Sequence, residues 1–318
     1  MDISVIIVNW NSFELLLKCL RSIYGIETIV KYEIIVIDNY STEREIENLN
    51  QYFKDVKLIL NNNNGGFAKA NNIASGYAKG DVLLFLNPDT LLKDNLLDEM
   101  YEILIKINEK VGIVGPKILN IDGSIQKEAA RYLPSVFSMF CNIFLLKRVF
   151  KNVGIFSEYI SNYSVSQEVE FISGACLAIR KTLFLKIGGF SEDYFMYSED
   201  DDICYKVIKM GLKNYYLASH EILHIGSACS KKTYNSKMFE CWFFKSRRLY
   251  FRNKSLLNFL ILNVIYVLGS LFRITLASLI LIYKVVLRCK KDEINYYKAV
   301  VKKYAEILLL GLGYDAKG

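Results

Sequence analysis

Short apolar runs alternate with longer amphipathic segments along the first half of the chain. The four most regular runs are rich in β-branched residues and cover 3–8, 33–37, 56–60 and 82–86. The segments between them, such as 12–23, carry apolar residues at the spacing of a helix that buries one face. This alternation is typical of βαβ units around a parallel sheet. The sequence therefore predicts an α/β fold in which the carboxyl ends of the strands share one edge, where ligands bind.

The same periodicities predict the remaining elements. Ser12 and Thr42 are expected to cap the first two helices. Helices are expected over 12–23, 43–53, 67–78, 95–108 and 199–210, and further strands over 111–117 and 171–180. Residues 132–168 mix aromatic and basic side chains without a clean period, and we interpret them as a mobile segment or an insertion.

Polar residues stand directly after the four apolar runs. They are Asn9, Asp38, Asn61 and the tripeptide Asn87-Pro88-Asp89. Because they share one edge of the predicted sheet, they should converge on one site, which their chemistry suits to a nucleotide sugar. The carboxylate of Asp89, beside a diphosphate, can hold a hard divalent cation that neutralises the leaving nucleoside diphosphate. Asn-Pro-Asp is also ordinary turn chemistry, so the tripeptide alone leaves both interpretations open.

The loop after the third run ends in Asn64-Gly65-Gly66-Phe67 and opens a predicted helix. Glycines let the backbone approach a phosphate, and a helix N-terminus offers N–H donors. The alternative is a polar loop with a glycine entry into the helix. The loop matches neither G-x-G-x-x-G nor G-x-x-x-x-G-K-[ST], which disfavours dinucleotide and P-loop binding.

The densest acidic cluster is Glu199-Asp200-Asp201-Asp202. Repulsion among its carboxylates is costly unless a cation or a proton-transfer role compensates, although an acidic helix start stabilised by the helix dipole is the alternative. Transfer of a sugar needs one base that deprotonates an acceptor hydroxyl. The two histidines, His220 and His224, have a spacing that could bind metal from one helical face, but their apolar neighbours favour a strand or a loop.

In their order along the chain, these residues resemble the family 2 inverting glycosyltransferases, especially the rhamnosyltransferase-like branch. Asn71 and His224 belong to the resemblance, which spans roughly residues 3–230. The strings that carry it are SVIIVNWNS from Ser4, EIIVIDN from Glu33, NGGFA from Asn64, LNPDT from Leu86, GPK from Gly115, SGAC from Ser173, GGF from Gly188 and YSEDDDIC from Tyr197.

The resemblance implies an A-type glycosyltransferase fold, which is a Rossmann-like mixed, mainly parallel sheet flanked by helices. It implies that Asp89 and His224 hold a divalent cation, Mg²⁺ or Mn²⁺. It also implies that Asp200, paired with Glu199, is the catalytic base and that Asp38 hydrogen-bonds the nucleobase. The donor-binding residues expected on this basis are Val8, Asn9, Asn11, Asp38, Asn64, Gly66, Phe67, Asn71, Asn87 and Gly174.

Two residues depart from the family pattern. Asn87 replaces the first acidic residue of the D-x-D motif, and Asp201 is acidic where the branch has an apolar residue. Asp201 is therefore a second carboxylate beside the expected base. No Q-x-x-R-W motif follows the acidic cluster, so a processive synthase is not expected.

Charge is distributed unevenly, because residues 1–205 carry 20 Lys and Arg against 27 Asp and Glu, whereas residues 206–318 carry 20 against 6. The basic part contains an apolar stretch, Leu256–Leu287, with Arg273 near its middle and basic residues on both sides. We expect anionic lipid as its partner, not nucleic acid. Arg273 and the flanks favour a re-entrant hairpin or an in-plane amphipathic pair over one crossing, and buried core helices are the alternative.

These features predict a catalytic nucleotide-sugar-binding domain over 1–230 and a membrane-associating helical region over 231–318. The odd number of cysteines, seven, without a C-x-x-C pair indicates free thiols in a reducing compartment, and no signal peptide is visible. We therefore predict a metal-dependent inverting glycosyltransferase at the cytoplasmic face of a membrane. It would move one sugar, with rhamnose as the candidate, to a lipid-linked or growing glycan. A catalytically silent nucleotide-sugar-binding subunit and a nucleotidyltransferase are the alternatives.

Overall fold

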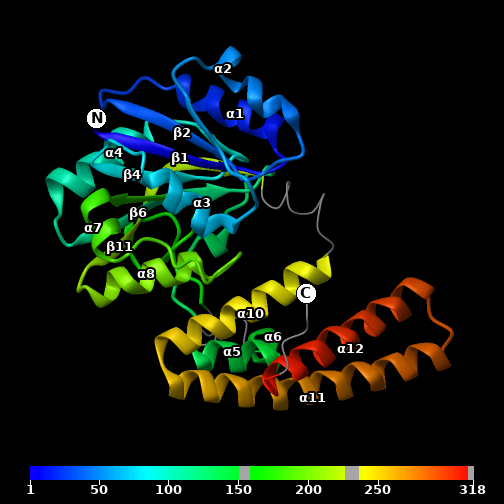
Figure 1. Ribbon diagram of the computed structural model, residues 1–318. Coiled ribbons are helices and arrows are strands. Elements are labelled where there is room, and N and C mark those ends of the chain that lie inside the picture. Colours follow the sequence, from blue (N-terminus) through cyan, green and yellow to red (C-terminus); the bar gives the residue numbers. More distant parts are fainter. Residues whose placement is uncertain (150–157, 226–235, 314–318) are drawn as a thin grey trace. The chain divides into compact units, whose positions relative to one another are not determined.

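The computed structural model describes residues 1–149, 158–225 and 236–313 (Figure 1). The chain divides into two compact units, of which the first comprises 1–133 and 159–234 and the second comprises 134–158 and 235–318. The second unit thus contains 134–158 as well as the C-terminal helices. The functional division at residue 230 stays a prediction.

A nine-stranded mixed sheet forms the centre of the first unit, in the order β3-β2-β1-β4-β10-β6-β11-β5, with β8 paired to β11. The pairs β1–β2, β1–β4, β2–β3 and β6–β11 are parallel. The predicted α/β fold with a mixed, mainly parallel sheet is confirmed. The strands are β1 Ile3–Asn9, β2 Tyr32–Asp38, β3 Lys57–Leu60, β4 Val82–Leu86, β5 Thr90–Leu92, β6 Val111–Leu119, β8 Gln167–Val169, β10 Cys176–Arg180 and β11 Lys213–His224, while β7 Ala130–Arg131 and β9 Phe171–Ile172 form a small second sheet.

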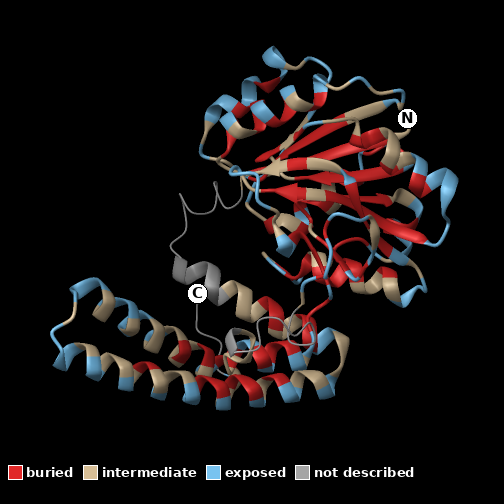
Figure 2. Ribbon diagram, turned by 180° about the vertical axis from the view of Figure 1, so that it is seen from behind, coloured by how far each residue is buried: buried red, intermediate tan, exposed pale blue. Residues whose placement is uncertain are grey.

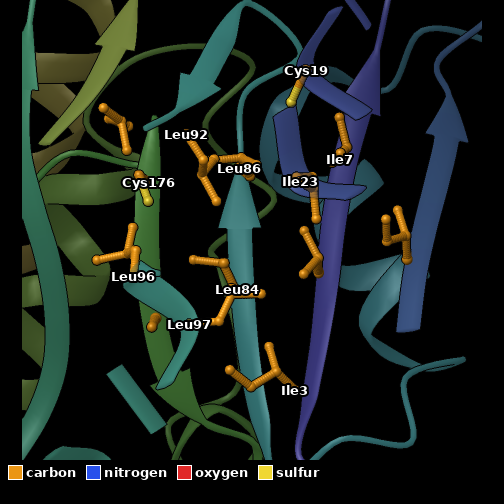
Figure 3. Close-up of a cluster of buried hydrophobic side chains, with 14 of the residues drawn as sticks. Ile3, Ile7, Cys19, Ile23, Leu84, Leu86, Leu92, Leu96, Leu97 and Cys176 are labelled. Atoms are coloured by element: carbon orange, nitrogen blue, oxygen red, sulfur yellow. The ribbon is translucent and has the colours of Figure 1, made fainter. Parts of the chain in front are cut away.

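Helices cover both faces of this sheet because alternate strand residues are apolar on both sides. Along β1, Ile3 and Ile7 belong to one core cluster and Ile6 to the other. The first cluster packs against α1 (Phe13–Tyr24) and α4 (Leu96–Glu102), which contribute Cys19, Ile23, Leu96 and Leu97 (Figure 3). The second cluster packs against α3 (Gly66–Ser75), α7 (Lys181–Lys186) and α8 (Glu199–Lys209).

Several predicted elements are shorter or more irregular than the sequence indicated. The second helix is a 3-10 turn over Arg44–Asn48 followed by α2 over Leu49–Tyr52, and only Ile46 and Leu49 in it are buried. This three-residue spacing suits a 3-10 turn. The fourth helix ends at Glu102 and continues as a π-helical turn over Ile103–Ile107. The strand expected over 171–180 is interrupted between β9 and β10.

Of the two predicted helix caps, Ser12 occupies the N-cap position of α1 but without a side-chain capping bond, and the prediction for Thr42 is wrong. The hydroxyl of Ser12 donates to Oδ1 of Asn9 at 3.0 Å and makes no capping bond to α1. The hydroxyl of Thr42 donates to Oδ1 of Asn11 at 3.1 Å, and Glu43 occupies the cap position of the next helical turn. Both hydroxyls therefore tie strand-end loops together instead of capping helices.

The second unit is helical and contains α5 (Val136–Ile143), α6 (Leu146–Val149), α10 (Ser236–Lys254), α11 (Leu256–Val286) and α12 (Lys291–Gly311). Part of the segment that lacked a clean period thus forms α5 and α6, and 150–157 lie outside the described residues. α5 approaches α11 closely at Gly269, where an added Cβ would lie 2.0 Å from Cγ2 of Ile143. α11 is one continuous helix, so the apolar stretch does not turn back on itself.

Candidate active site

A cavity of about 730 Å³ opens at the carboxyl edge of the parallel strands. The ends of β1 and β4, the starts of α3 and α8, and the break between β9 and β10 supply its walls. Ten of the predicted site residues line it, namely Val8, Asn64, Gly66, Phe67, Asn87, Asp89, Gly174, Glu199, Asp200 and His224. Four others, Asn9, Asn11, Asp38 and Asn71, do not line the cavity.

Asp38 lies behind the cavity wall in a closed hydrogen-bond network. Its Oδ1 accepts bonds from Nδ2 of Asn9 at 2.8 Å and from the hydroxyl of Ser41 at 2.6 Å, and its Oδ2 accepts the backbone N–H of Ser41 at 2.9 Å. The next residue, Asn39, reaches the cavity and donates to Oδ1 of Asn64 at 2.8 Å. The nucleobase role of Asp38 stays a prediction.

The glycine at the entry of α3 is required by its backbone. Gly66 has φ of +84°, and a Cβ there would lie 2.4 Å from the carbonyl oxygen of Phe195. The N–H groups of Gly65, Gly66 and Phe67 donate to Asn39, Asn64 and Phe195. Because these three donors are engaged within the protein, they do not form the open anion cradle that the loop sequence predicted.

Asp89 and His224 lie together because β5 and β11 pair in register, with Thr90 opposite His224. Nε2 of His224 is 3.2 Å from Oδ1 of Asp89 and 3.3 Å from Nδ2 of Asn87. Gln126 holds the histidine from the other side. Its Nε2 donates to the carbonyl of His224 at 2.8 Å, and its Oε1 lies 3.0 Å from Nδ1 of the ring.

The arrangement around His224 suits a divalent cation. The carbonyl of His224 can only accept, which directs Nε2 of Gln126 to it and leaves Oε1 to accept from Nδ1–H. Nε2 of His224 then presents a lone pair to the carboxylate of Asp89, and two acceptors 3.2 Å apart need a cation or a proton between them. Neighbouring ligands of an octahedral Mg²⁺ lie roughly 3.0 Å apart. Among the described residues, no group of three His, Cys, Asp or Glu side chains is arranged to hold a metal. A cation at Asp89 and His224 would therefore also need ligands from a diphosphate or water.

The other histidine serves a separate surface. Nδ1 of His220 is 2.9 Å from Oε2 of Glu99, and both residues line a second cavity of about 580 Å³. Both histidines belong to β11, as their apolar neighbours indicated. They therefore do not form a shared helical metal site.

The four acidic residues at the start of α8 separate into two pairs. Asp201 forms a buried ion pair with Arg131, with 2.8 Å between Oδ1 and Nη2, and Asp202 pairs with Lys206 at 3.0 Å. Glu199 and Asp200 line the cavity instead. Neither of these two forms an ion pair with any residue that the structure describes. The extra carboxylate of Asp201 is therefore neutralised away from the cavity.

Burial and mutual repulsion raise the pKa of both cavity carboxyls. Burial and, next, the charge of Asp201 raise the pKa of Asp200 to about 6, against the opposing effects of Arg131 and of the N–H of Gly174, which lies 3.3 Å from Oδ2. Burial and the charge of Asp200 hold the pKa of Glu199 well above its usual range. With a pKa of about 6, Asp200 is mostly charged at neutral pH.

The backbone before these carboxyls is strained. Tyr197 and Ser198 both have left-handed φ values, 68° and 66°, which side chains with a Cβ rarely adopt. The turn they form aims the start of α8 at the cavity, and such strain concentrates at functional sites.

The structure adds cavity residues to which the sequence patterns assigned no role in the site. Trp10 and Asn39 directly adjoin predicted residues, and their position beside strand ends was a usable signal. Gln126 is 98 positions from His224, and only the paired strands reveal that they meet. The added lining residues include Trp10, Ser12, Asn39, Asn120, Gln126, Glu128, Ser173, Phe195, Met196, Tyr197 and Ile225.

Strand-end polar residues, a carboxylate–histidine pair and an acidic helix start meet around one cavity, an arrangement suited to a group-transfer enzyme. Residues 4–188 match the family described as glycosyl transferase family 2. The match covers more than half of the chain, and the protein belongs to glycosyl transferase family 2. Residues 154–232 also match the family described as the N-terminal domain of galactosyltransferase. The family and the rhamnosyltransferase-like character predicted from the sequence are confirmed.

The chain is similar to several curated glycosyltransferases. It is 27% identical over 265 residues to rhamnosyltransferase WbbL of Escherichia coli (strain K12), which covers 80% of this chain and 94% of that protein. It is 29% identical over 203 residues to N-acetylglucosaminyl-diphospho-decaprenol L-rhamnosyltransferase of Mycobacterium tuberculosis, covering 60% and 66% of the two chains. With the low-salt glycan biosynthesis hexosyltransferase Agl10 of Haloferax volcanii it shares 27% identity over 211 residues, 64% of this chain and 61% of that one. The matched regions thus span less than two thirds of the Mycobacterium and Haloferax proteins.

Solved structures share the fold. The mannosyltransferase PcManGT from Pyrobaculum calidifontis, in complex with GDP-Man and Mn²⁺, has a TM-score of 0.58 at 14% identity and covers 98% of this chain and 86% of its own. GalNAc-T7 with UDP, GalNAc and Mn²⁺ has a TM-score of 0.55 at 21% identity and covers 70% of this chain and 44% of its own. The A-type fold predicted from the sequence is confirmed.

Proposed function

We propose that this protein is an inverting, metal-dependent glycosyltransferase. It moves a single sugar from a nucleotide-diphosphate sugar to a hydroxyl group of a lipid-linked or growing glycan. The names of the relatives support rhamnose as the donor sugar and a lipid-linked acceptor. The observation that carries the proposal is the shared cavity, which has a carboxylate–histidine pair at one end and, at the other, the carboxylate of Asp200 with a raised pKa.

The chemistry requires one displacement. Asp200 accepts the proton of the acceptor hydroxyl as that oxygen bonds to the anomeric carbon. The bond between this carbon and the diphosphate oxygen breaks on the opposite face, so the configuration inverts and no enzyme nucleophile is needed. The N–H of Gly174 and that of Asp201, which bond to the two oxygens of Asp200, orient the carboxylate for this transfer.

The leaving diphosphate develops negative charge that this end of the cavity must offset. Mg²⁺ or Mn²⁺ held by Asp89 and His224 would supply that compensation. Gln126 fixes the ring through Nδ1, which leaves Nε2 of His224 to the cation. Asp38 and the residues around it hold the end of β1, where the nucleobase is proposed to lie.

A product assay tests the proposal. Donor-dependent release of nucleoside diphosphate, with metal and a lipid-linked glycan acceptor, separates transfer from both alternatives. A silent binding subunit shows a thermal shift with nucleotide sugar and no release, and a nucleotidyltransferase releases pyrophosphate. The anomeric configuration of the product, read by NMR, must be opposite to that of the donor. A panel of nucleotide sugars with Mn²⁺ or Mg²⁺, screened by thermal shift, identifies the donor.

We also propose that residues 231–318 attach the enzyme to the cytoplasmic face of an anionic membrane. Among the described residues, α11 is long and apolar enough to cross a bilayer by length and composition. Its basic flanks and the lipid-linked acceptors named for relatives support membrane attachment more directly.

A further inference from the structure

The apolar side chains of α11 form one exposed stripe along the whole helix. They recur at intervals of three and four residues, the period of a single helical face. Figure 2 shows exposed positions recurring from one end of α11 to the other. The exposed residues of this stripe are Leu257, Ile261, Val264, Leu268, Leu271, Leu279, Ile282 and Val286.

The polar interruptions of α11 beyond its first turn point to its helical partners. Oδ1 of Asn263 accepts a bond from Nε of Arg248 in α10 at 2.9 Å. The guanidinium of Arg273 lies 4.5 Å from the ring centre of Tyr304 in α12. Lys284 forms an ion pair with Glu293 of α12. Arg273, which argued from the sequence against a single membrane crossing, therefore belongs to the packed side of the helix.

The stripe side has little polar character. Thr275 is its exposed polar residue near the centre, and its hydroxyl donates to the carbonyl of Leu271 at 2.9 Å. A hydroxyl satisfied within its own helix is tolerated in an apolar medium. The stripe is thus suited to a medium that makes no hydrogen bonds.

The charges around the stripe fit an anionic surface. The second unit carries 18 Lys and Arg against 6 Asp and Glu. Arg252 precedes the stripe and Arg288, Lys290 and Lys291 follow it, all of them exposed. Basic residues therefore stand at both ends of an apolar face, which suits phospholipid headgroups on either side of inserted side chains.

The length of α11 and the charges of α12 together decide how α11 meets the bilayer. A helix of 31 residues is about 46 Å long, whereas the apolar part of a bilayer is about 30 Å thick. A return crossing by α12 is excluded by its charges, because Lys291, Asp292, Glu293, Lys298, Lys302, Lys303 and Glu306 all lie within it. A helix parallel to the membrane plane buries the stripe and leaves these charges in water.

We propose that the stripe of α11 inserts into the boundary between headgroups and acyl chains of an anionic bilayer, with the helix axis parallel to the membrane. The inference rests on the membrane location proposed above and adds to it the inserted face and the orientation. One leaflet is occupied, and the opposite side of α11 stays packed on α5, α10 and α12.

The depth at which positions along the stripe insert into the bilayer tests the orientation of α11. Leu257→Trp, Leu268→Trp and Val286→Trp, made singly in the full chain, place a reporter at the start, middle and end. Quenching by lipids brominated at defined depths is measured on phosphatidylcholine–phosphatidylglycerol vesicles, with the wild type as background for Trp10 and Trp242. In-plane insertion gives the same depth at all three positions. A deep middle between two shallow ends would mean a crossing and would overturn the proposal.

A charge substitution tests the face. Val264→Glu with Leu268→Glu should lower vesicle partitioning at least about tenfold, since two aliphatic side chains lose their burial. The matched control is Ile121→Glu with Leu185→Glu, at exposed apolar positions of the first unit, which should bind vesicles like the wild type. Equal loss in both variants, or a soluble dimer that the stripe variant dissociates, would refute the lipid assignment.

Nucleotide-sugar binding keeps the two proposals apart. Each variant and the wild type are also followed by thermal shift with the donor identified above. A stripe variant that no longer binds vesicles but still shows the thermal shift with the donor supports the assignment of the stripe as the membrane face. A wild type that binds vesicles as described but shows no donor shift and no nucleotide release overturns the enzymatic proposal alone.

Discussion

The two ends of the active-site cavity treat negative charge in opposite ways. At the strand end, Asp89 and His224 present two acceptors to each other, and the protein places no cation between them. At the helix end, Arg131 takes up the charge of Asp201 and leaves Asp200 in the cavity without an ion-pair partner among the described residues. One end can be balanced by a bound cation, as proposed, while the charge of Asp201 at the other end is balanced internally by Arg131. This division of charge is what a displacement with a base on one side and a leaving diphosphate on the other requires.

The largest effect is expected from removing the base. Asp200→Asn should reduce turnover by about 10²–10⁴-fold, because the acceptor hydroxyl loses its proton acceptor. Donor affinity, measured by calorimetry, should stay close to that of the wild type, since the chemical step is affected and not ground-state binding. Asp202→Asn is the matched control, because this carboxylate pairs with Lys206 away from the cavity. Unchanged turnover in Asp200→Asn would move the role of base to Glu199.

Removing the proposed metal ligand Asp89 should impair the function of the opposite end of the cavity. Asp89→Ala should lower turnover by at least about 10²-fold. The variant loses the cation that would stabilise the charge on the leaving diphosphate by several kcal/mol. Calorimetric titration with Mn²⁺ in the presence of nucleoside diphosphate should show the loss of metal binding. The control is Asp94→Ala, whose carboxylate is 40% exposed and lies outside the cavity lining. Metal binding equal to that of the wild type in Asp89→Ala would exclude this residue as a ligand.

Substitutions of Gln126 test the same end of the cavity without replacing either proposed metal ligand. Gln126→Leu removes both bonds to His224 and should weaken Mn²⁺ binding by about 10–100-fold, the usual cost of losing a partner that orients a ligand. Gln126→Glu keeps an acceptor for Nδ1–H and should lose less. Gln51→Leu, at an exposed position of α2, is the control. Equal Mn²⁺ affinity in Gln126→Leu and the control would show that His224 needs no such support.

Sequence patterns predicted the strand end better than the helix end. Asn87 and Asp89 follow a regular apolar strand, Val8 lies near the end of another, and a parallel sheet brings strand ends together whatever separates them in sequence. The charge balance at the helix end depends on Arg131, which lies in β7, a two-residue strand that no periodicity marks. The same limit applies to Gln126, which follows a turn. In the second unit, composition identified an apolar stretch, but only the helix packing separates the face of Arg273 from the exposed stripe.

The smallest expected effect concerns the pH profile and tests the internal balance at the helix end. With a pKa of about 6, Asp200 loses its ability to accept a proton as the pH falls below that value, so turnover at saturating substrates should decline on the acid side with a limb near pH 6. Asp201 raises this pKa and Arg131 lowers it.

Asp201→Asn removes the repulsion between Asp201 and Asp200 and leaves the positive charge of Arg131. The acid limb should therefore move to lower pH by about one unit. The carboxamide still accepts from Nη2 of Arg131, which also donates from Nη1 to the carbonyl of Tyr132, and this keeps the arginine in place. Turnover at pH 8 should change little, because Asp200 is charged there in both proteins. Asp202→Asn again serves as the control. An acid limb that stays in place in Asp201→Asn, with circular dichroism unchanged, would mean that the charge of Asp201 does not reach the base.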